Sequence, residues 1–213
     1  MVEKELSIQR VNSYNDPRFS PRVLRQHGAF LVNDVPCEVE ITGADTAVVR
    51  GVQERDAIQL VEEFRFYAEH ISHFYDDREN LLAEYPPVRL FSIKLSEIQP
   101  SQFFVDDEKL SAVKTFLSAP EDIIIPVIRR EERYVSLDGH TRLAAAIDAG
   151  FDTVFAFLSD SGDAILGFVE EAKRRGILSP YDMRRVPHEE YEVVWNQFCE
   201  KFFEEKQKEN QEP

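Results

Sequence analysis

The residues best suited to chemistry lie together in residues 137–146, Leu-Asp-Gly-His-Thr-Arg-Leu-Ala-Ala-Ala. Asp138 and His140 could serve as acid, base or metal ligand. Arg142 carries a fork of donors suited to phosphate oxygens. Gly139 lets the backbone take positive φ or come close to a ligand. This combination indicates a site for a small anion.

A strand followed directly by a helix must position these side chains. The apolar residues Tyr134, Val135 and Leu137 indicate a strand, and the alanine-rich run that follows indicates a helix ending at Gly150. The first turn of a helix offers backbone N–H groups without intrahelical partners, at the positive end of the dipole. We expect a phosphate to bind here. The expected phosphate-binding residues are Gly139, His140, Thr141 and Arg142.

Each of these residues also has a purely structural interpretation. Asp138 could cap the helix, Gly139 could make the turn, and His140 could bond locally. Arg142 could pair with an acidic surface residue. Taken together, the four residues favour phosphate binding over the structural alternative.

Composition narrows the classes of function. The 213 residues carry a formal net charge of −15, which disfavours general binding to nucleic acid. No apolar run is long enough to cross a membrane, and the N-terminus lacks the pattern of a signal peptide. Cys37 and Cys199 are too few for a disulfide framework or a cysteine-based zinc site. We therefore expect a cytoplasmic location and no resident metal.

The N-terminal part, residues 1–87, predicts an α+β extension. We expect an irregular arm over residues 1–28, antiparallel strands over 29–52 and a long amphipathic helix over 55–76. The sequence Tyr-Pro-Pro that ends at residue 87 is the expected domain boundary. We recognise no family in this part.

Three side chains on the expected long helix have a spacing that could chelate a metal. They are His70, His73 and Asp77. Two half-exposed histidines beside an aromatic face are the stronger interpretation, because nothing in the sequence supplies a second shell of ligands.

The remainder predicts a second domain over residues 88–160 and C-terminal helices over 161–213. Strands are expected at 88–95, 123–128, 133–137 and 153–158. Asp106 or Asp107 should cap a helix after the first strand. Two further helices, at about 163–175 and after Pro187, and a frayed tail from Glu204 should end the chain. The fold class is therefore α+β.

Residues 88–158 resemble the ParB/sulfiredoxin fold, which implies a mixed sheet. The resemblance rests on an ordered set of motifs covering about a third of the chain. These are Ile-Lys-Leu-Ser-Glu-Ile-Gln-Pro at 93–100, Pro-Val-Ile at 126–128 and Leu-Asp-Gly-His-Thr-Arg-Leu-Ala-Ala at 137–145.

Two branches of that superfamily fit poorly. Sulfiredoxins place a catalytic cysteine directly after the corner glycine, where this chain has His140. Chromosome-partitioning ParB domains have two arginines in the corner and a helix-turn-helix, whereas this chain has Arg142 alone in the corner and is strongly acidic.

The corner is similar to that of the free serine kinases, which reads Asp-Gly-His-His-Arg, with Thr141 in place of the second histidine. The resemblance implies ATP or ADP with Mg²⁺ as cofactor and a small hydroxyl compound such as serine as substrate. It implies catalytic roles for Asp138 and His140 and a substrate pocket at Ser101 and Gln102. Gln102 stands where those kinases have a glutamate thought to act as base, and glutamine cannot take a proton as a carboxylate does.

Two other functions remain open beside a kinase. The chain could be a regulatory module that binds a nucleotide or metabolite without catalysis, which Gln102 and Thr141 favour. A ParB-like nuclease is the weaker alternative, because the charge is acidic. Residues 1–87 could pair with another chain, which would make a homodimer.

Overall fold

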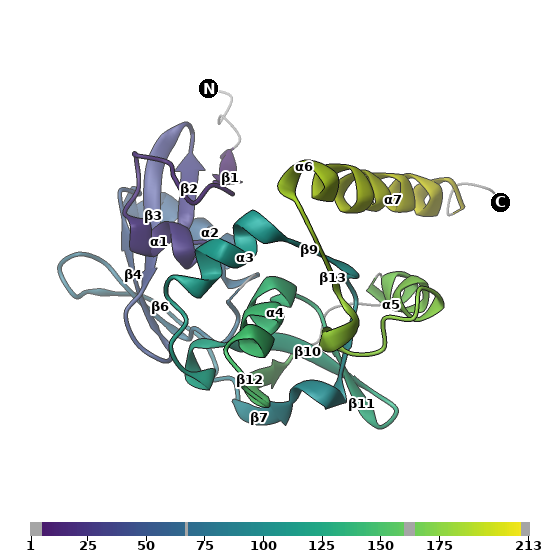
Figure 1. Ribbon diagram of the computed structural model, residues 1–213. Coiled ribbons are helices and arrows are strands. Elements are labelled where there is room, and N and C mark those ends of the chain that lie inside the picture. The colour runs from purple at the N-terminus through teal and green to yellow at the C-terminus, as the bar shows by residue number, and fades with distance from the viewer. Residues whose placement is uncertain (1–5, 67, 160–164, 210–213) are drawn as a thin grey trace. The chain divides into compact units, whose positions relative to one another are not determined.

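The computed structural model describes residues 6–66, 68–159 and 165–209, with the backbone alone for 205–209. It divides into two compact units, residues 1–90 and 91–213, each with its own sheet and core (Figure 1). Both units combine helices with sheets, so the protein is of the α+β class. None of the described helices is long and apolar enough to span a membrane.

The first unit has a six-stranded sheet in the order β1-β2-β3-β4-β5-β6. All neighbours are antiparallel except β4 and β5, which are parallel. The strands are β1 (Ile8–Arg10), β2 (Ala29–Val32), β3 (Val35–Ile41), β4 (Thr46–Arg50), β5 (His73–Tyr75) and β6 (Leu81–Glu84). The expected antiparallel strands over 29–52 are thus confirmed.

Two helices cover this sheet, α1 (Pro21–Arg25) and α2 (Glu54–Arg65). Buried residues of α2 pack with alternate residues of the strands, including Phe30, Val39 and Phe74, whose side chains are at most 1% exposed. Burial of such large apolar side chains stabilises a fold by about 1.5–3 kcal/mol each. The arm expected over residues 1–28 is wrong in part, because it contains β1 and α1.

The long helix expected over residues 55–76 is confirmed as far as Arg65 and wrong beyond it. Helix α2 ends at Arg65, and Ala68 and Ile71 lie in turns whose amides bond to carbonyls three residues earlier. The chain then enters β5, where Phe74 is fully buried beside β4. Apolar residues at helical spacing therefore occupy a helix, a turn and a strand, all facing one core.

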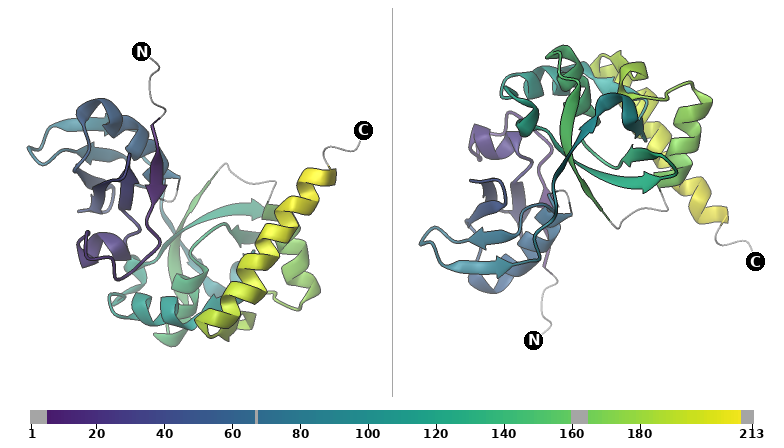
Figure 2. Two further views of the ribbon diagram at one scale, coloured as in Figure 1. Left: turned by 90° about the horizontal axis from the view of Figure 1, so that it is seen from above. Right: turned by 90° about the horizontal axis from the view of Figure 1, so that it is seen from below.

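The second unit has a curled five-stranded sheet in the order β7-β12-β10-β11-β8 (Figure 2). Pairing is parallel for β10 with β12 and for β8 with β11, and otherwise antiparallel, so the sheet is mixed. The strands are β7 (Phe91–Lys94), β8 (Ile98–Pro100), β10 (Ile124–Arg130), β11 (Arg133–Ser136) and β12 (Thr153–Leu158). The strands expected at 123–128, 133–137 and 153–158 are confirmed.

Helices lie on both faces of this sheet. On one face, Leu143 and Ala146 of α4 (His140–Asp148) pack with Ile125 and Val127, and α3 (Asp107–Lys114) packs beside α4. On the other face, Val169 of α5 (Ile165–Arg174) packs with residues of β10 and β11. Asp106 caps α3 by accepting from the amides two and three residues later, as the sequence indicates.

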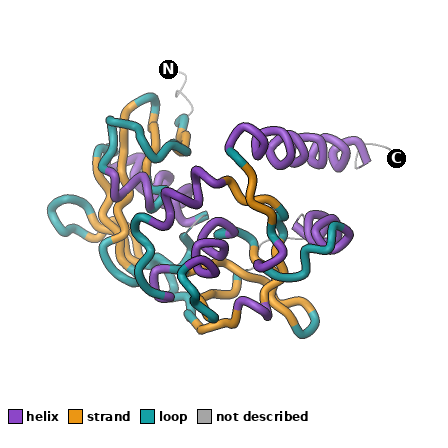
Figure 3. The backbone as a smooth tube through the Cα atoms, in the orientation of Figure 1, coloured by secondary structure: helices purple, strands orange, loops and turns teal. Residues whose placement is uncertain are grey.

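A short parallel pair, β9 (Phe104–Asp106) with β13 (Arg184–Val186), leads to the C-terminal helices (Figure 3). These are α6 (His188–Tyr191), a π-helical segment (Glu192–Asn196) and α7 (Gln197–Glu209). The frayed tail expected from Glu204 is wrong as far as Glu209. Aromatic residues of α7 pack against α5 and Phe103.

Candidate functional site

The corner between β11 and α4 is built by the backbone. The amide of Leu137 donates to the carbonyl of Pro126 at 3.0 Å, and Gly139 then takes φ +82° as the N-cap of α4. A Cβ at this glycine would lie 2.6 Å from Cγ2 of Ile125. Only glycine fits this conformation and this space, so the sharp turn from strand to helix depends on Gly139.

The imidazole of His140 points into the unit rather than outward. The residue is 5% exposed, and its Nε2 lies 3.0 Å from Ser136 Oγ, 3.2 Å from the amide nitrogen of Ser101 and 3.2 Å from Ser101 Oγ. The Ser101 hydroxyl donates to the carbonyl of Ser136 at 2.8 Å. The Ser136 hydroxyl and the Ser101 amide are therefore the donors to Nε2, which assigns the ring proton to Nδ1.

Burial lowers the pKa of His140 to about 4, against a raising effect of Asp138 and a further lowering effect of Arg142. The imidazole is then neutral at neutral pH, with its acceptor nitrogen already engaged by two donors. A group in this state links β8, β11 and α4 and is poorly placed to take a proton from a substrate.

Asp138 and Arg142 lie at the outer side of the corner. Arg142 donates through Nη1 to the carbonyl of Ile124 at 2.8 Å, and its Nη2 lies 3.5 Å from Oδ2 of Asp138. The side chain of Asp138 is 53% exposed and that of Arg142 24% exposed. Arg142 thus has Nη1 fixed to the sheet, and its Nη2 lies beside the exposed carboxylate of Asp138.

Ser101 and Gln102 belong to the framework around the corner. Ser101 is 3% exposed and bonds to His140 and Ser136 as described above. The side-chain amide of Gln102 donates to the carbonyl of Phe104 and to the hydroxyl of Tyr191, the latter at 3.2 Å. Contact of either residue with a substrate stays a prediction.

A second polar cluster, which the sequence did not reveal, lies where α6 meets α3. Asp106 Oδ2 is 2.7 Å from Nδ1 of His188, 82 positions away, and the carboxylate is fully buried. Burial opposes ionisation of Asp106, but His188 and two backbone amides keep the pKa of Asp106 below its usual value. The bond to Asp106 and its charge raise the pKa of His188, whose side chain is 43% exposed.

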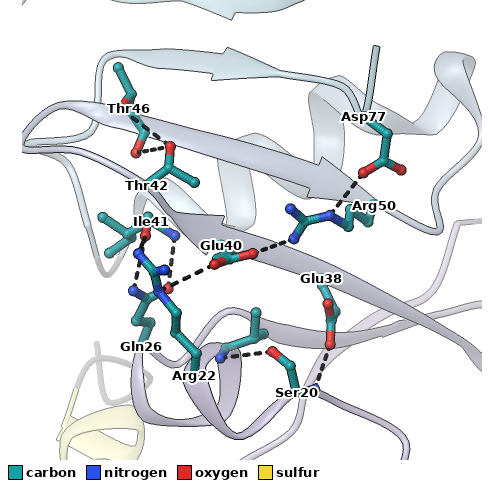
Figure 4. Close-up of polar contacts among 11 residues, drawn as sticks. Ser20, Arg22, Gln26, Glu38, Glu40, Ile41, Thr42, Thr46, Arg50 and Asp77 are labelled. Carbon is teal, nitrogen blue, oxygen red and sulfur yellow. Dashed lines mark hydrogen bonds and ion pairs between the residues drawn. The ribbon is translucent and has the colours of Figure 1, made fainter. Parts of the chain in front are cut away.

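The first unit contains a polar network of its own on β3 and β4 (Figure 4). Glu40 lies 3.2 Å from Nε of Arg22 and 2.5 Å from Nη1 of Arg50, and Nε of Arg50 lies 2.8 Å from Asp77. The side-chain amide of Gln26 pairs with both backbone groups of Ile41. These contacts fasten α1 and the turn after β5 to the sheet.

The three residues spaced for metal chelation do not share a helix face. His73 is in β5, with its two ring nitrogens 3.4 Å from Asp45 and 3.7 Å from Glu84, while Asp77 bonds to Arg50. Within residues 6–66, 68–159 and 165–209, no group of three or more His, Cys, Asp or Glu side chains is arranged to hold a metal.

Comparisons with known proteins add little. No protein-family model and no curated protein matches the sequence. One structural match is the crystal structure of protein Atu1540 from Agrobacterium tumefaciens, with a TM-score of 0.34 and 17% identity. It covers 48% of this chain, and this chain spans 65% of that one. A match of this size does not establish a shared fold or function.

Proposed function

We propose that residues 91–213 form a ParB/sulfiredoxin-like module that binds the phosphate of a nucleotide at the N-terminus of α4 without transferring it. The state of His140 carries the proposal. A buried, neutral imidazole that accepts bonds from Ser101 and Ser136 holds the corner rigid and is itself not available as a base. A rigid helix N-terminus with an arginine beside it is suited to binding an anion.

Backbone and side-chain groups of the corner each contact a different part of the phosphate's surroundings. The backbone amides that follow Gly139 face the phosphate, and Thr141, which is half-buried in the first turn of α4, can donate its hydroxyl. Arg142 supplies the positive charge, and Asp138 must give up its contact with Arg142 when the phosphate arrives. Mg²⁺ accompanies the nucleotide, because Asp138 alone offers the ion one exposed carboxylate at the corner.

Isothermal titration with ADP, ATP and CTP, each with Mg²⁺, tests this proposal. We expect micromolar binding that Arg142→Ala weakens at least tenfold, about 1.4 kcal/mol. Asp138→Asn should strengthen binding, because it frees Arg142 for the phosphate. The matched control is Arg129→Ala, which removes one exposed arginine of β10 in the same unit. No binding of any nucleotide would contradict the proposal.

A phosphotransferase acting on a small hydroxyl compound is the second candidate, and one observation favours it. Asp138 places an exposed carboxylate within 3.5 Å of Arg142, in the position where an acceptor hydroxyl could be activated. A kinase would convert serine and ATP to phosphoserine and ADP, and Asp138→Asn would abolish this. A binding module without catalysis predicts that the natural protein does not phosphorylate serine and that Asp138→Asn binds nucleotide more tightly. Measurements on the natural protein and on Asp138→Asn therefore separate the two functions.

A further inference from the structure

The loop between β8 and α3 contacts both the corner and the C-terminal helices. We refer to residues 101–106 of this loop as the strap. The strap begins at Ser101, which follows β8, and ends at Asp106, which caps α3. It includes β9, which pairs with β13 just before the C-terminal helices.

Three strap residues hold the C-terminal helices. Gln102 donates to the Tyr191 hydroxyl at 3.2 Å, and Asp106 bonds to His188 at 2.7 Å. Between them Phe103, 1% exposed, packs in edge contact with an indole and a phenyl ring, with centroids at 4.8 and 5.1 Å. Those rings belong to Trp195 and Phe198. The strap and the C-terminal helices are therefore joined at three of the six strap residues.

The first strap residue holds the corner. The amide and hydroxyl of Ser101 lie 3.2 Å from Nε2 of His140, in the first turn of α4. Only one peptide bond separates Ser101 from Gln102. A displacement of the strap would therefore remove one of the two donors to Nε2 of His140.

We propose that the C-terminal helices position the anion-binding corner through the strap, with His188 and Tyr191 as the positioning residues. Contacts His188–Asp106 and Tyr191–Gln102 fix the strap, the strap fixes Ser101, and Ser101 fixes His140 and the start of α4. Changes at α6 then alter affinity at the corner although neither residue touches the ligand. The effect on affinity rests on the proposed function, whereas the effect on Ser101 does not.

The double variant His188→Ala with Tyr191→Phe tests the proposal by amide hydrogen exchange without ligand. We expect the Ser101 amide to exchange at least tenfold faster, with the imidazole signals of His140 shifted. The amide of Val127, in the middle of β10, should be unchanged. The matched control is Tyr181→Phe, which removes the hydroxyl of a tyrosine that is 52% exposed. Unchanged exchange at Ser101 would overturn the proposal.

Two further measurements keep the test decisive. Trp195 is the only tryptophan of the chain, so its emission reports whether the C-terminal helices stay packed on Phe103. If the double variant unfolds, the exchange rate of the Ser101 amide is measured in Tyr191→Phe alone, which removes only one oxygen. That rate then decides the proposal. If the natural protein binds nucleotide, the double variant should weaken binding at least threefold, and equal affinity would contradict the coupling. If it binds none, the proposed function fails, and exchange at Ser101 still decides.

Discussion

His140 and His188 show how differently one residue type behaves in two regions of the same unit. His140 is 5% exposed and accepts hydrogen bonds, and burial lowers its pKa to about 4. His188 is half-exposed and donates to a buried carboxylate, which raises its pKa. Burial therefore favours the neutral ring in the histidine of the motif, whereas the buried carboxylate favours the protonated ring in the histidine that lies outside any motif.

The comparison shows that motif position and chemical state are separate questions. The motif Asp-Gly-His-x-Arg fixes a backbone corner, and the surrounding serines decide what its histidine can do. The spacing of residues in the sequence indicates the backbone corner. The chemical state of the histidine depends on Ser136 and Ser101, which lie 4 and 39 positions away in the chain.

The largest difference should appear when each imidazole is removed. His140→Ala leaves a cavity and deprives the Ser136 hydroxyl and the Ser101 amide of their acceptor. We expect a loss of about 3 kcal/mol in the free energy of unfolding, measured in urea. His188→Ala should cost clearly less, because its side chain is partly exposed and Asp106 keeps two backbone donors. Equal losses would break the comparison.

The pH dependence of stability should follow the lowered pKa of His140. The unfolded chain binds a proton at this histidine below about pH 6.5, whereas the native chain does so only below about pH 4. Its contribution is thus present above pH 6.5 and is lost as pH falls toward 4, by at most about 3 kcal/mol. Urea unfolding of His140→Asn should show a flatter profile over this range, and an identical profile would count against a buried neutral ring.

A substitution at the glycine of the corner should have a smaller effect. Gly139→Ala should cost about 2 kcal/mol, from the left-handed backbone and the contact with Ile125. Gly150→Ala is the matched control, with φ +75° and no atom within 4 Å of the added methyl group. The unfolding temperature of Gly139→Ala should be lower than that of Gly150→Ala. The reverse order would show that the corner can relax around the added methyl group.

The smallest effect is expected at the partner of His188. Asp106→Ala removes the cap of α3 and should cost about 1 kcal/mol. The pKa of His188, followed by NMR, should fall when this carboxylate is removed. Asp107→Ala, one residue later and exposed, should leave that pKa nearly unchanged. A pKa of His188 that is insensitive to Asp106 would remove the contrast between the two histidines.

Much of the second unit could be predicted from its sequence, because the signals there are local. The cap at Asp106, the strands around Pro126 and Tyr134, and the turn at Gly139 each depend on residues close in the chain. In the first unit, the helix prediction failed at residues 66–76. The helical spacing of apolar residues continues there, although the chain leaves α2 and enters β5. Only the parallel pairing of Phe74 with Ala47 decides that segment, and such pairing is not encoded locally.

At the corner between β11 and α4, the backbone could be predicted and the burial of the histidine could not. Gly139 and Arg142 lie at the corner as expected. The burial of His140 could not be foreseen, because it requires Ser101 to arrive from β8 and Ser136 to share the face of β11 that α4 covers. The bond between Asp106 and His188 had no signal beyond a helix cap and a histidine after Pro187.

The most direct test of a neutral, structural His140 is an NMR pH titration of the histidine side chains. We predict that Nε2 of His140 is unprotonated at pH 7 and that this ring titrates only near pH 4. His188 should titrate above its ordinary value in the same samples. A His140 ring that titrates near pH 6.5 would contradict the account and return this histidine to the candidates for proton transfer.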